Sequence, residues 1–299
     1  MDLSIVIPLY NEAENIRPLI GKLSTMVEKC ECTAEVILIN DGSTDATRPE
    51  LEEAIKPHPS FKAFHLRRNR GKSAAYTLGF KNATGRLIAT MDGDLQDDPG
   101  DILKMMRAMT EPVDFIVGWK SEGKNGPMKS LYSKLFNFVV ILLSGLRVHD
   151  INCPLRLFRR ECITDLKLKG DFFRYIPLLV AWKGYKVTEV PVSNHERIHG
   201  RSKFSINRYF EAVIDLLTLL FLHRYSEKPM HFFSAVGLGV FTAGFGIDLF
   251  LTIRGLFFTG IIGHFALLLL GVFLMLLGVQ IMIFGFIAAL MVLRREPEL

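Results

Sequence analysis

The first 120 residues alternate short apolar runs with stretches in which apolar residues recur at helical spacing. Strands alternating with helices in this way predict an α/β domain with a mostly parallel sheet that is covered on both faces. The predicted strands are residues 3–7, 35–39, 61–66, 86–91 and 114–118, and the predicted helices include residues 15–28, 47–55 and 99–109. Ligands of such sheets bind at the carboxyl ends of the strands, so functional residues are expected there.

Residues 206–222 are strongly apolar on one side and carry Arg208, Glu211 and Asp215 on the other. The pattern predicts an amphipathic helix, which either lies in a membrane interface or closes the preceding domain. Residues 128–148 also have a broad apolar face, and their pattern fits a core helix and an interfacial helix equally well.

Two later stretches, residues 232–253 and 265–293, are long enough to cross a bilayer, and the second contains no ionisable residue. Basic residues flank the outer ends of this pair, which predicts that both termini are cytoplasmic. Gly271, Gly278 and Gly285 recur every seven residues and therefore line one face of the second helix. Small residues on one face let helices approach closely in lipid, either the first span or a helix of another copy.

These patterns divide the chain into an α/β domain (residues 1–205), a juxtamembrane amphipathic helix (206–229) and a transmembrane domain of two helices (230–299). Hydrophobic residues reach 49% while charged residues still make up 22%, as expected when the two kinds are segregated. The net charge of +5 is modest, and the basic residues do not interleave with aromatic ones. A membrane surface or an anionic phosphate is therefore a better partner than nucleic acid.

The four cysteines (Cys30, Cys32, Cys153 and Cys162) form no CxxC pair, so we predict reduced, structural thiols.

The strongest chemical signal is an acidic pair, Asp92 and Asp94, directly after the predicted fourth strand. Two carboxylates separated by one residue at a strand end can both point at one cation, and Gln96 supplies a third oxygen. Hard oxygen ligands suit Mg²⁺ or Mn²⁺, ions that proteins usually share with substrate phosphates. An acidic pair in a loop is also common without any metal, so its position after a buried strand gives the signal its weight.

Three further motifs follow predicted strands. They are residues 7–12 (Ile-Pro-Leu-Tyr-Asn-Glu), residues 39–43 (Ile-Asn-Asp-Gly-Ser) and the basic loop 67–72 (Arg-Arg-Asn-Arg-Gly-Lys). Asp41 in the second motif has the chemistry to accept hydrogen bonds from a nucleobase, but the motif also has ideal composition for a simple turn. No G-x-G-x-x-G follows the first strand, which disfavours a dinucleotide-binding site.

The order and spacing of these four motifs resemble the inverting family-2 glycosyltransferases with the GT-A fold. Later segments narrow the likeness to bacterial polyprenyl-phosphate glycosyltransferases, relatives of dolichyl-phosphate mannosyltransferase with two C-terminal spans. These segments are residues 117–120, 133–137, 149–156, 174–177, 182–185, 189–192 and 195–204. The resemblance covers essentially the whole chain.

This resemblance implies a nucleotide sugar and a polyprenyl phosphate as substrates, a divalent cofactor, and inverting transfer at the inner (cytoplasmic) membrane. Nucleotide-sugar contacts are expected from Pro8, Tyr10, Glu12, Ile39, Asp41, Lys72, Asp92, Gly93 and Asp94. Asp92, Asp94 and Gln96 would hold Mg²⁺ or Mn²⁺, and Lys120, Arg174, Arg197, Arg201, Ser202 and Lys203 would face the acceptor phosphate. The residues expected to act directly in catalysis are Asp92, Asp94, Arg197 and Lys203. A UDP-sugar is the preferred donor, with GDP-mannose as an alternative, and relatives of this type suggest a tetramer.

Two positions depart from the family pattern. Many relatives carry Arg where this chain has Lys120, and a lysine cannot make the bidentate phosphate contact of an arginine. Pro154 stands where some relatives carry Gly or an acid, so no catalytic carboxylate can be assigned there; Asp150 is near, with a turn-capping role as an equal alternative. A phosphate acceptor needs no general base, because its second pKa is about 6 and it is ionised at neutral pH.

Two other functions remain open at this point. A processive polysaccharide synthase shares the early motifs but typically adds a Gln-x-x-Arg-Trp segment, and neither Trp119 nor Trp182 lies in such a context. A catalytically silent membrane scaffold of the same fold would not need Asp41, Asp92, Asp94 and Lys203, which are all present.

Overall fold

The computed structural model describes residues 1–120, 141, 145–146, 148–164, 166, 168–195, 207–225, 228–257 and 264–293. These residues form two compact units, Met1–Leu216 and Leu217–Leu299. Most of the ambiguous segment 128–148 lies outside the described residues, as do the predicted phosphate contacts Arg197, Arg201, Ser202 and Lys203.

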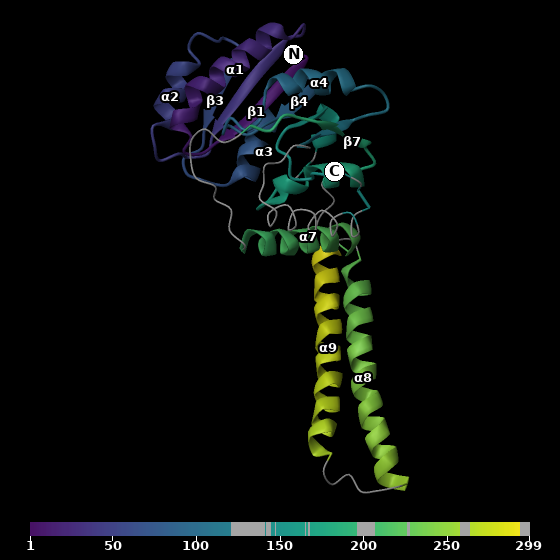
Figure 1. The fold of residues 1–299 in the computed structure, drawn as a ribbon. Helices are drawn as coiled ribbons and strands as arrows, with labels where there is room; N and C mark the ends of the chain where they lie inside the picture. Colours follow the sequence, from purple (N-terminus) through teal and green to yellow (C-terminus); the bar gives the residue numbers. More distant parts are fainter. Residues whose placement is uncertain are drawn as a thin grey trace. The chain divides into compact units, whose positions relative to one another are not determined.

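Within the described residues, the first unit contains a seven-stranded sheet of order β3-β2-β1-β4-β6-β5-β7 (Figure 1). Its strands are β1 (Leu3–Leu9), β2 (Ala34–Asn40), β3 (Phe61–His65), β4 (Leu87–Thr90), β5 (Phe115–Trp119), β6 (Arg156–Arg159) and β7 (Val187–Pro191). β1 pairs in parallel with β2 and β4, β2 with β3, and β5 with β7. β6 runs antiparallel to both β4 and β5. The prediction of a mostly parallel sheet is confirmed, with one reversed strand inserted.

Helices cover both faces of the sheet. Successive side chains of a strand point to opposite faces, so a mostly apolar strand presents apolar side chains to the helices on each face. The helices of this unit are η1 (Ala13–Asn15), α1 (Ile16–Lys29), α2 (Thr47–Ala54), α3 (Lys72–Asn82), α4 (Gly100–Ala108), η2 (Arg160–Ile163), η3 (Phe172–Tyr175) and α6 (Ile176–Trp182). On one face, Val6 of β1 lies against Gly79 of α3, where an added Cβ would be 2.2 Å from the valine Cγ1. On the other face, Leu9 of β1 and Leu19 of α1 lie close together. Burial of both faces explains why β1 and β2 are mostly apolar.

At the amino-terminal edge of the sheet, the buried carboxylate of Glu35 lies at the centre of a polar network. It accepts hydrogen bonds from Ser4 Oγ at 2.7 Å, from the backbone N–H and hydroxyl of Thr84 at 2.7 Å each, and from Lys62 Nζ at 2.8 Å. Burial raises the pKa of Glu35, but these hydrogen bonds outweigh burial and lower the pKa to about 2. Folding therefore favours the ionised form of Glu35.

We expect Glu35→Gln to lower the free energy of unfolding at pH 7 by about 1.5–3 kcal/mol, the usual contribution of hydrogen bonds to a charged group. The ionised Glu35 stabilises the fold fully above its ordinary pKa of 4.5, and this contribution is lost as the pH falls toward about 2. Thermal unfolding of wild type and variant between pH 7 and pH 3 tests this, with the exposed Glu28→Gln as control. The difference between wild type and Glu35→Gln should shrink at acid pH; a constant difference would contradict the assignment.

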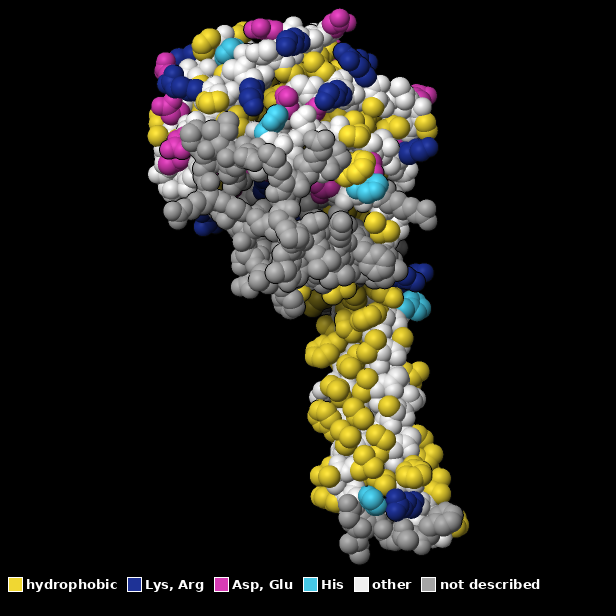
Figure 2. Space-filling model, in the orientation of Figure 1, with side chains coloured by type: hydrophobic (Ala, Val, Ile, Leu, Met, Phe, Trp, Pro, Cys, Tyr) yellow, Lys and Arg dark blue, Asp and Glu magenta, His cyan; other side chains and the backbone are white. Residues whose placement is uncertain are grey.

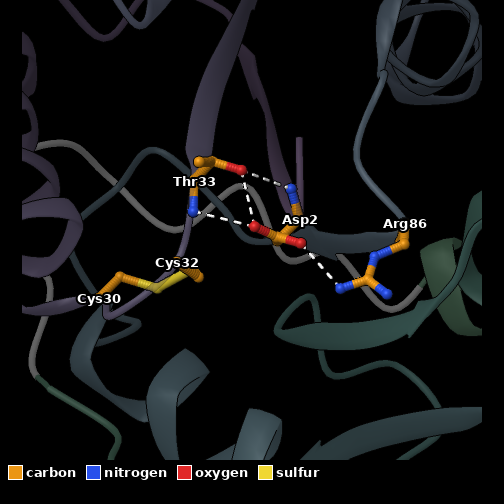
Figure 3. Close-up of a disulfide and its surroundings, with 5 residues drawn as sticks. All are labelled: Asp2, Cys30, Cys32, Thr33 and Arg86. Carbon is orange, nitrogen blue, oxygen red and sulfur yellow. Dashed lines mark hydrogen bonds and ion pairs between the residues drawn. A yellow bond between two sulfur atoms is a disulfide. The ribbon is translucent and has the colours of Figure 1, made fainter.

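The prediction of four reduced thiols is wrong for one pair, because Cys30 and Cys32 form a disulfide (Figure 3). The turn from α1 into β2 brings their Cα atoms to 5.1 Å, within disulfide range. Close by, Asp2 accepts hydrogen bonds from Thr33 and Arg86, as the dashed lines in Figure 3 show. This cluster lies at the amino-terminal edge of the sheet, the edge opposite the predicted motifs. Cys153 and Cys162 are free and buried, as predicted.

The second unit is dominated by two long apolar helices, α8 (Pro229–Phe257) and α9 (Phe265–Leu293), which run side by side (Figure 1). Both are long and apolar enough to cross a membrane. Hydrophobic side chains cover the face of this pair seen in Figure 2, and acidic side chains are seen only on the first unit in that view. The preceding helix α7 (Asn207–Tyr225) belongs partly to each unit, so its interfacial placement stays a prediction.

The glycines of α9 pack against α8, which is one of the two partners that the sequence left open. A Cβ added at Gly271 would be 2.1 Å from a carboxylate oxygen of Asp248, and one added at Gly278 would be 2.5 Å from the carbonyl oxygen of Gly237. One added at Gly285 would be 2.6 Å from Cβ of Phe233. The glycine face thus allows close packing of the two helices of one chain.

Candidate active site

Hydrogen bonds join the loops that follow β1 and β2. The Asp41 N–H donates to the Leu9 carbonyl at 2.8 Å, and the Asn11 N–H donates to Ser43 Oγ at 2.9 Å. In return, the Asn11 side-chain oxygen accepts the Thr44 N–H at 2.9 Å. Asn11 has a φ of 56°, a left-handed conformation that asparagine tolerates better than most residues. The first two sequence motifs therefore form one continuous surface.

Asp41 holds the basic loop between β3 and α3. Its side chain is buried, and its two oxygens accept the N–H groups of Arg70 at 2.8 Å and Gly71 at 2.9 Å. Gly42 has a φ of +64°, and an added Cβ there would lie 2.3 Å from the carbonyl carbon of Arg68. The turn interpretation of this motif is thus correct in structural terms. Each carboxylate oxygen has a second lone pair, so a nucleobase contact remains compatible with it.

The other predicted nucleoside residues lie around this surface. Pro8 and Ile39 are partners across β1 and β2. The Ile39 side chain is fully buried in the core, which leaves only its backbone for a ligand. Glu12 accepts a hydrogen bond from Asn15 Nδ2 at 2.6 Å. Tyr10, the residue directly after β1, is partly exposed.

Lys72 and Asp92 form an ion pair that connects the third and fourth motifs. Lys72 Nζ lies 2.6 Å and 2.7 Å from the two carboxylate oxygens of Asp92. The lysine is the first residue of α3, directly after Gly71 with a φ of +84°. Both side chains are partly exposed, at 29% and 24%. The structure therefore brings all four motifs together at one edge of the sheet, from Leu9 through Asp41 to this pair.

Asp94 and Gln96 lie in the tight turn that follows. Asp94 is 6% exposed, and one of its carboxylate oxygens accepts the Gln96 N–H at 3.2 Å. Leu95 between them has a φ of 64°, and Gly93 packs directly against Leu9.

Two carboxylates and an amide near one strand end have donor chemistry that fits Mg²⁺ or Mn²⁺. In the part of the chain that the structure describes, no group of three His, Cys, Asp or Glu side chains forms a complete metal site.

Asp97, which the sequence analysis did not single out, forms a buried ion pair with Lys120. Its carboxylate lies 2.8 Å from Lys120 Nζ, and its second oxygen accepts the Asp92 N–H at 3.2 Å. Burial raises the pKa of Asp97. Burial also opposes the charged form of Lys120, but Asp97 outweighs burial and raises the lysine pKa above its ordinary value. Lys120, predicted to face the acceptor phosphate, thus pairs with Asp97, while 18% of its side chain remains exposed.

Arg174 and Phe173 approach the site from η3. The Arg174 side chain is nearly buried, pairs with Asp171, and places its guanidinium carbon 5.7 Å from the centre of the Phe173 ring. Beneath them, the fully buried Arg156 of β6 donates to the Phe173 carbonyl at 2.8 Å. Arg156 is the first residue of β6, before two apolar residues, and the sequence analysis left it without a role.

Asp150 has the turn-capping role that the sequence left as one of two alternatives. Its carboxylate accepts the Asn152 N–H at 3.1 Å, and its carbonyl accepts the Cys153 N–H at 3.4 Å. Burial raises the pKa of Asp150. These contacts fix the loop that precedes β6.

The Glycosyl transferase family 2 model matches residues 4–166, a range that contains all four motifs. The chain belongs to this family. This glycosyltransferase is 36% identical to dodecaprenyl-phosphate galacturonate synthase of Rhizobium johnstonii over 293 residues, 96% of this chain and 87% of that protein. It is 30% identical to undecaprenyl-phosphate 4-deoxy-4-formamido-L-arabinose transferase of Pseudomonas aeruginosa, over 95% of this chain and 83% of that protein.

Solved structures share the fold of the first unit. Glucosyl-3-phosphoglycerate synthase from Mycobacterium tuberculosis in complex with Mn²⁺ and UDP-glucose superposes with a TM-score of 0.58 at 17% identity. The match covers 73% of this chain and 78% of that one. Mannosyl-3-phosphoglycerate synthase from Rubrobacter xylanophilus matches with a TM-score of 0.57 over 74% of each chain. The GT-A-like fold predicted from the sequence is confirmed.

Proposed function

We propose that this glycosyltransferase transfers a sugar from a nucleotide-sugar donor to a polyprenyl phosphate at the cytoplasmic face of the inner membrane. The observation that carries the proposal is the meeting of four motifs at one sheet edge, in a chain that also ends in two helices able to span a membrane. Two relatives named for polyprenyl-phosphate substrates, each matched over at least 95% of this chain, support it.

The donor would bind across the ends of β1, β2 and β4. The nucleoside would contact Pro8, Tyr10, Glu12, Asp41 and the Ile39 backbone, and the diphosphate would lie near Lys72 and Gly93. Asp92, Asp94 and Gln96 would hold Mg²⁺ or Mn²⁺, which when bound stabilises negative charge on the leaving diphosphate. A structural neighbour that binds Mn²⁺ and UDP-glucose supports this choice of cofactor and a UDP-sugar as donor.

The acceptor phosphate would attack the anomeric carbon from the face opposite the nucleotide, which inverts its configuration. Because the phosphate is already ionised, the protein needs to orient it and offset its charge rather than remove a proton. Arg174, Arg197, Arg201, Ser202 and Lys203 would do this. Lys120 would contribute less to this set, since its ammonium group already pairs with the buried Asp97. The cytoplasmic placement of both termini and the tetramer remain predictions.

The test is a transfer assay with the full-length chain in detergent, undecaprenyl phosphate and Mn²⁺. The donors would be UDP-glucose, UDP-galacturonate, UDP-4-deoxy-4-formamido-L-arabinose and GDP-mannose. We expect one of them to give a lipid carrying a single sugar of inverted configuration. Undecaprenol, which lacks the phosphate, should accept none.

Three outcomes would contradict the proposal. Equal transfer to undecaprenol would remove the phosphate from the mechanism, and a polymeric product would favour the processive synthase. Absence of turnover with every donor would favour the silent scaffold.

A further inference from the structure

The ion pair between Lys72 and Asp92 lies where the proposed function needs a divalent ion. Both carboxylate oxygens of Asp92 are engaged by the same ammonium group, at 2.6 Å and 2.7 Å. An ion that takes Asp92 as a ligand competes with this ammonium, because two cations repel each other at one carboxylate. The chain thus carries its own competitor for the ion.

The surroundings of Lys72 leave the ammonium room to move without unfolding the helix start. Lys72 Nζ is 5.4 Å from the centre of the Phe173 ring, a favourable distance for a cation over an aromatic face. The backbone that carries this ring is held in place, because the Phe173 N–H donates to Ser73 Oγ at 3.2 Å and the Phe173 carbonyl accepts from Arg156. The lysine side chain is also 29% exposed, so its flexible stem reaches solvent and any ligand there.

A diphosphate would change the competition between Lys72 and the divalent ion for Asp92. Alone, a divalent ion gains Asp92 only by separating the Lys72 ammonium from its anionic partner. With a diphosphate present, the ammonium has an anionic partner of its own, and both cations are neutralised together.

We propose that Lys72 occupies Asp92 until the nucleotide diphosphate arrives, so that the ion and the donor bind as a coupled pair instead of the ion binding first. Lys72 is in this sense a positioning residue that suppresses unproductive binding of the ion to the empty site. The inference rests on the proposed function, because it assumes that Asp92 is a ligand of the ion.

The experiment measures Mn²⁺ binding to the full-length protein in detergent by electron paramagnetic resonance of free Mn²⁺, with and without UDP. We expect Lys72→Met to bind Mn²⁺ alone about tenfold to 100-fold more tightly than wild type, since it removes a charge-assisted hydrogen bond at the ligand. UDP should strengthen Mn²⁺ binding by a larger factor in wild type than in Lys72→Met. The same loss of coupling should appear when Mn²⁺ strengthens UDP binding, because coupling is reciprocal.

Lys81→Met is the matched control, because Lys81 is an exposed lysine near the other end of α3 and the variant has the same net charge. It should bind Mn²⁺ as wild type does. If Lys72→Met binds Mn²⁺ alone no more tightly than Lys81→Met, the inference is wrong while the proposed function stands. If wild type with UDP binds no Mn²⁺ at all, the metal assignment of the proposed function fails, and the inference falls with it.

Discussion

Replacing Asp94 by alanine is expected to abolish measurable sugar transfer, with kcat/KM lower by at least about 10²–10³-fold. Removing one group that stabilises transition-state charge usually costs this much, and even residues behind a metal ligand change affinity or activity by about 10–100-fold. Asp94 is 6% exposed in the turn after β4, so its carboxylate is held in one place and not free in solvent. The measurement is the initial rate of lipid-linked product formation with Mn²⁺ and the preferred donor.

Asp94→Asn separates the loss of charge from damage to the turn. The asparagine keeps an oxygen that can accept the Gln96 N–H, as Asp94 does at 3.2 Å, but it is a weaker ligand for Mn²⁺ because it is neutral. We therefore expect Asp94→Asn to unfold at the same temperature as wild type, yet to lose most of its activity. Wild-type protein after exhaustive chelation should be equally inactive. An Asp94→Asn enzyme that kept full Mn²⁺-dependent activity would refute the metal assignment.

The parts of this site that the sequence predicted depend on local pattern. The runs that became β1 and β2 are mostly apolar, so their ends, and with them the positions of Tyr10 and Asp41, could be located from the sequence. Parallel strands end at the same edge of a sheet, which is why motifs far apart along the chain were expected to meet. The hydrogen bond between Asp41 and Leu9 joins the first two of these motifs.

What the sequence did not predict depends on contacts between distant segments. β6 enters the sheet between β4 and β5 and runs antiparallel to both, and no local pattern gives strand order. That insertion fixes Arg156 under Phe173. Lys120 likewise looks like a free cation in the sequence, because no local sequence pattern near it predicts that Asp97 lies 2.8 Å from its ammonium group.

Replacing Lys120 by methionine is expected to be strongly destabilising. The substitution leaves the Asp97 carboxylate, which is fully buried, without its partner charge. Breaking a buried pair in this way typically costs about 3–5 kcal/mol, which for a domain of this size lowers the unfolding midpoint by roughly 6–20 °C. Lys56→Met is the matched control, because Lys56 pairs with Glu53 at an exposed position and should change stability by less than about 0.5 kcal/mol.

The double variant Asp97→Asn/Lys120→Met tests whether the cost comes from the stranded charge. A neutral amide at position 97 is far cheaper to bury than an unpaired carboxylate, so most of the lost stability should return. Non-additivity of this size is expected only for residues in direct contact. If the double variant is as unstable as Lys120→Met, the loss comes from packing of the lysine side chain and not from the ion pair.

The pH dependence of Lys120→Met gives an independent check of the same charge. Burial already raises the pKa of Asp97, and removal of the lysine raises it further. The folded variant then holds a proton that the unfolded chain releases, so its stability falls as the pH rises. Relative to wild type, Lys120→Met should therefore lose more stability at pH 8 than at pH 5, whereas the deficit of the double variant should not depend on pH. If Lys120→Met loses the same amount of stability at pH 5 and at pH 8, Asp97 does not carry the buried charge on which this prediction depends.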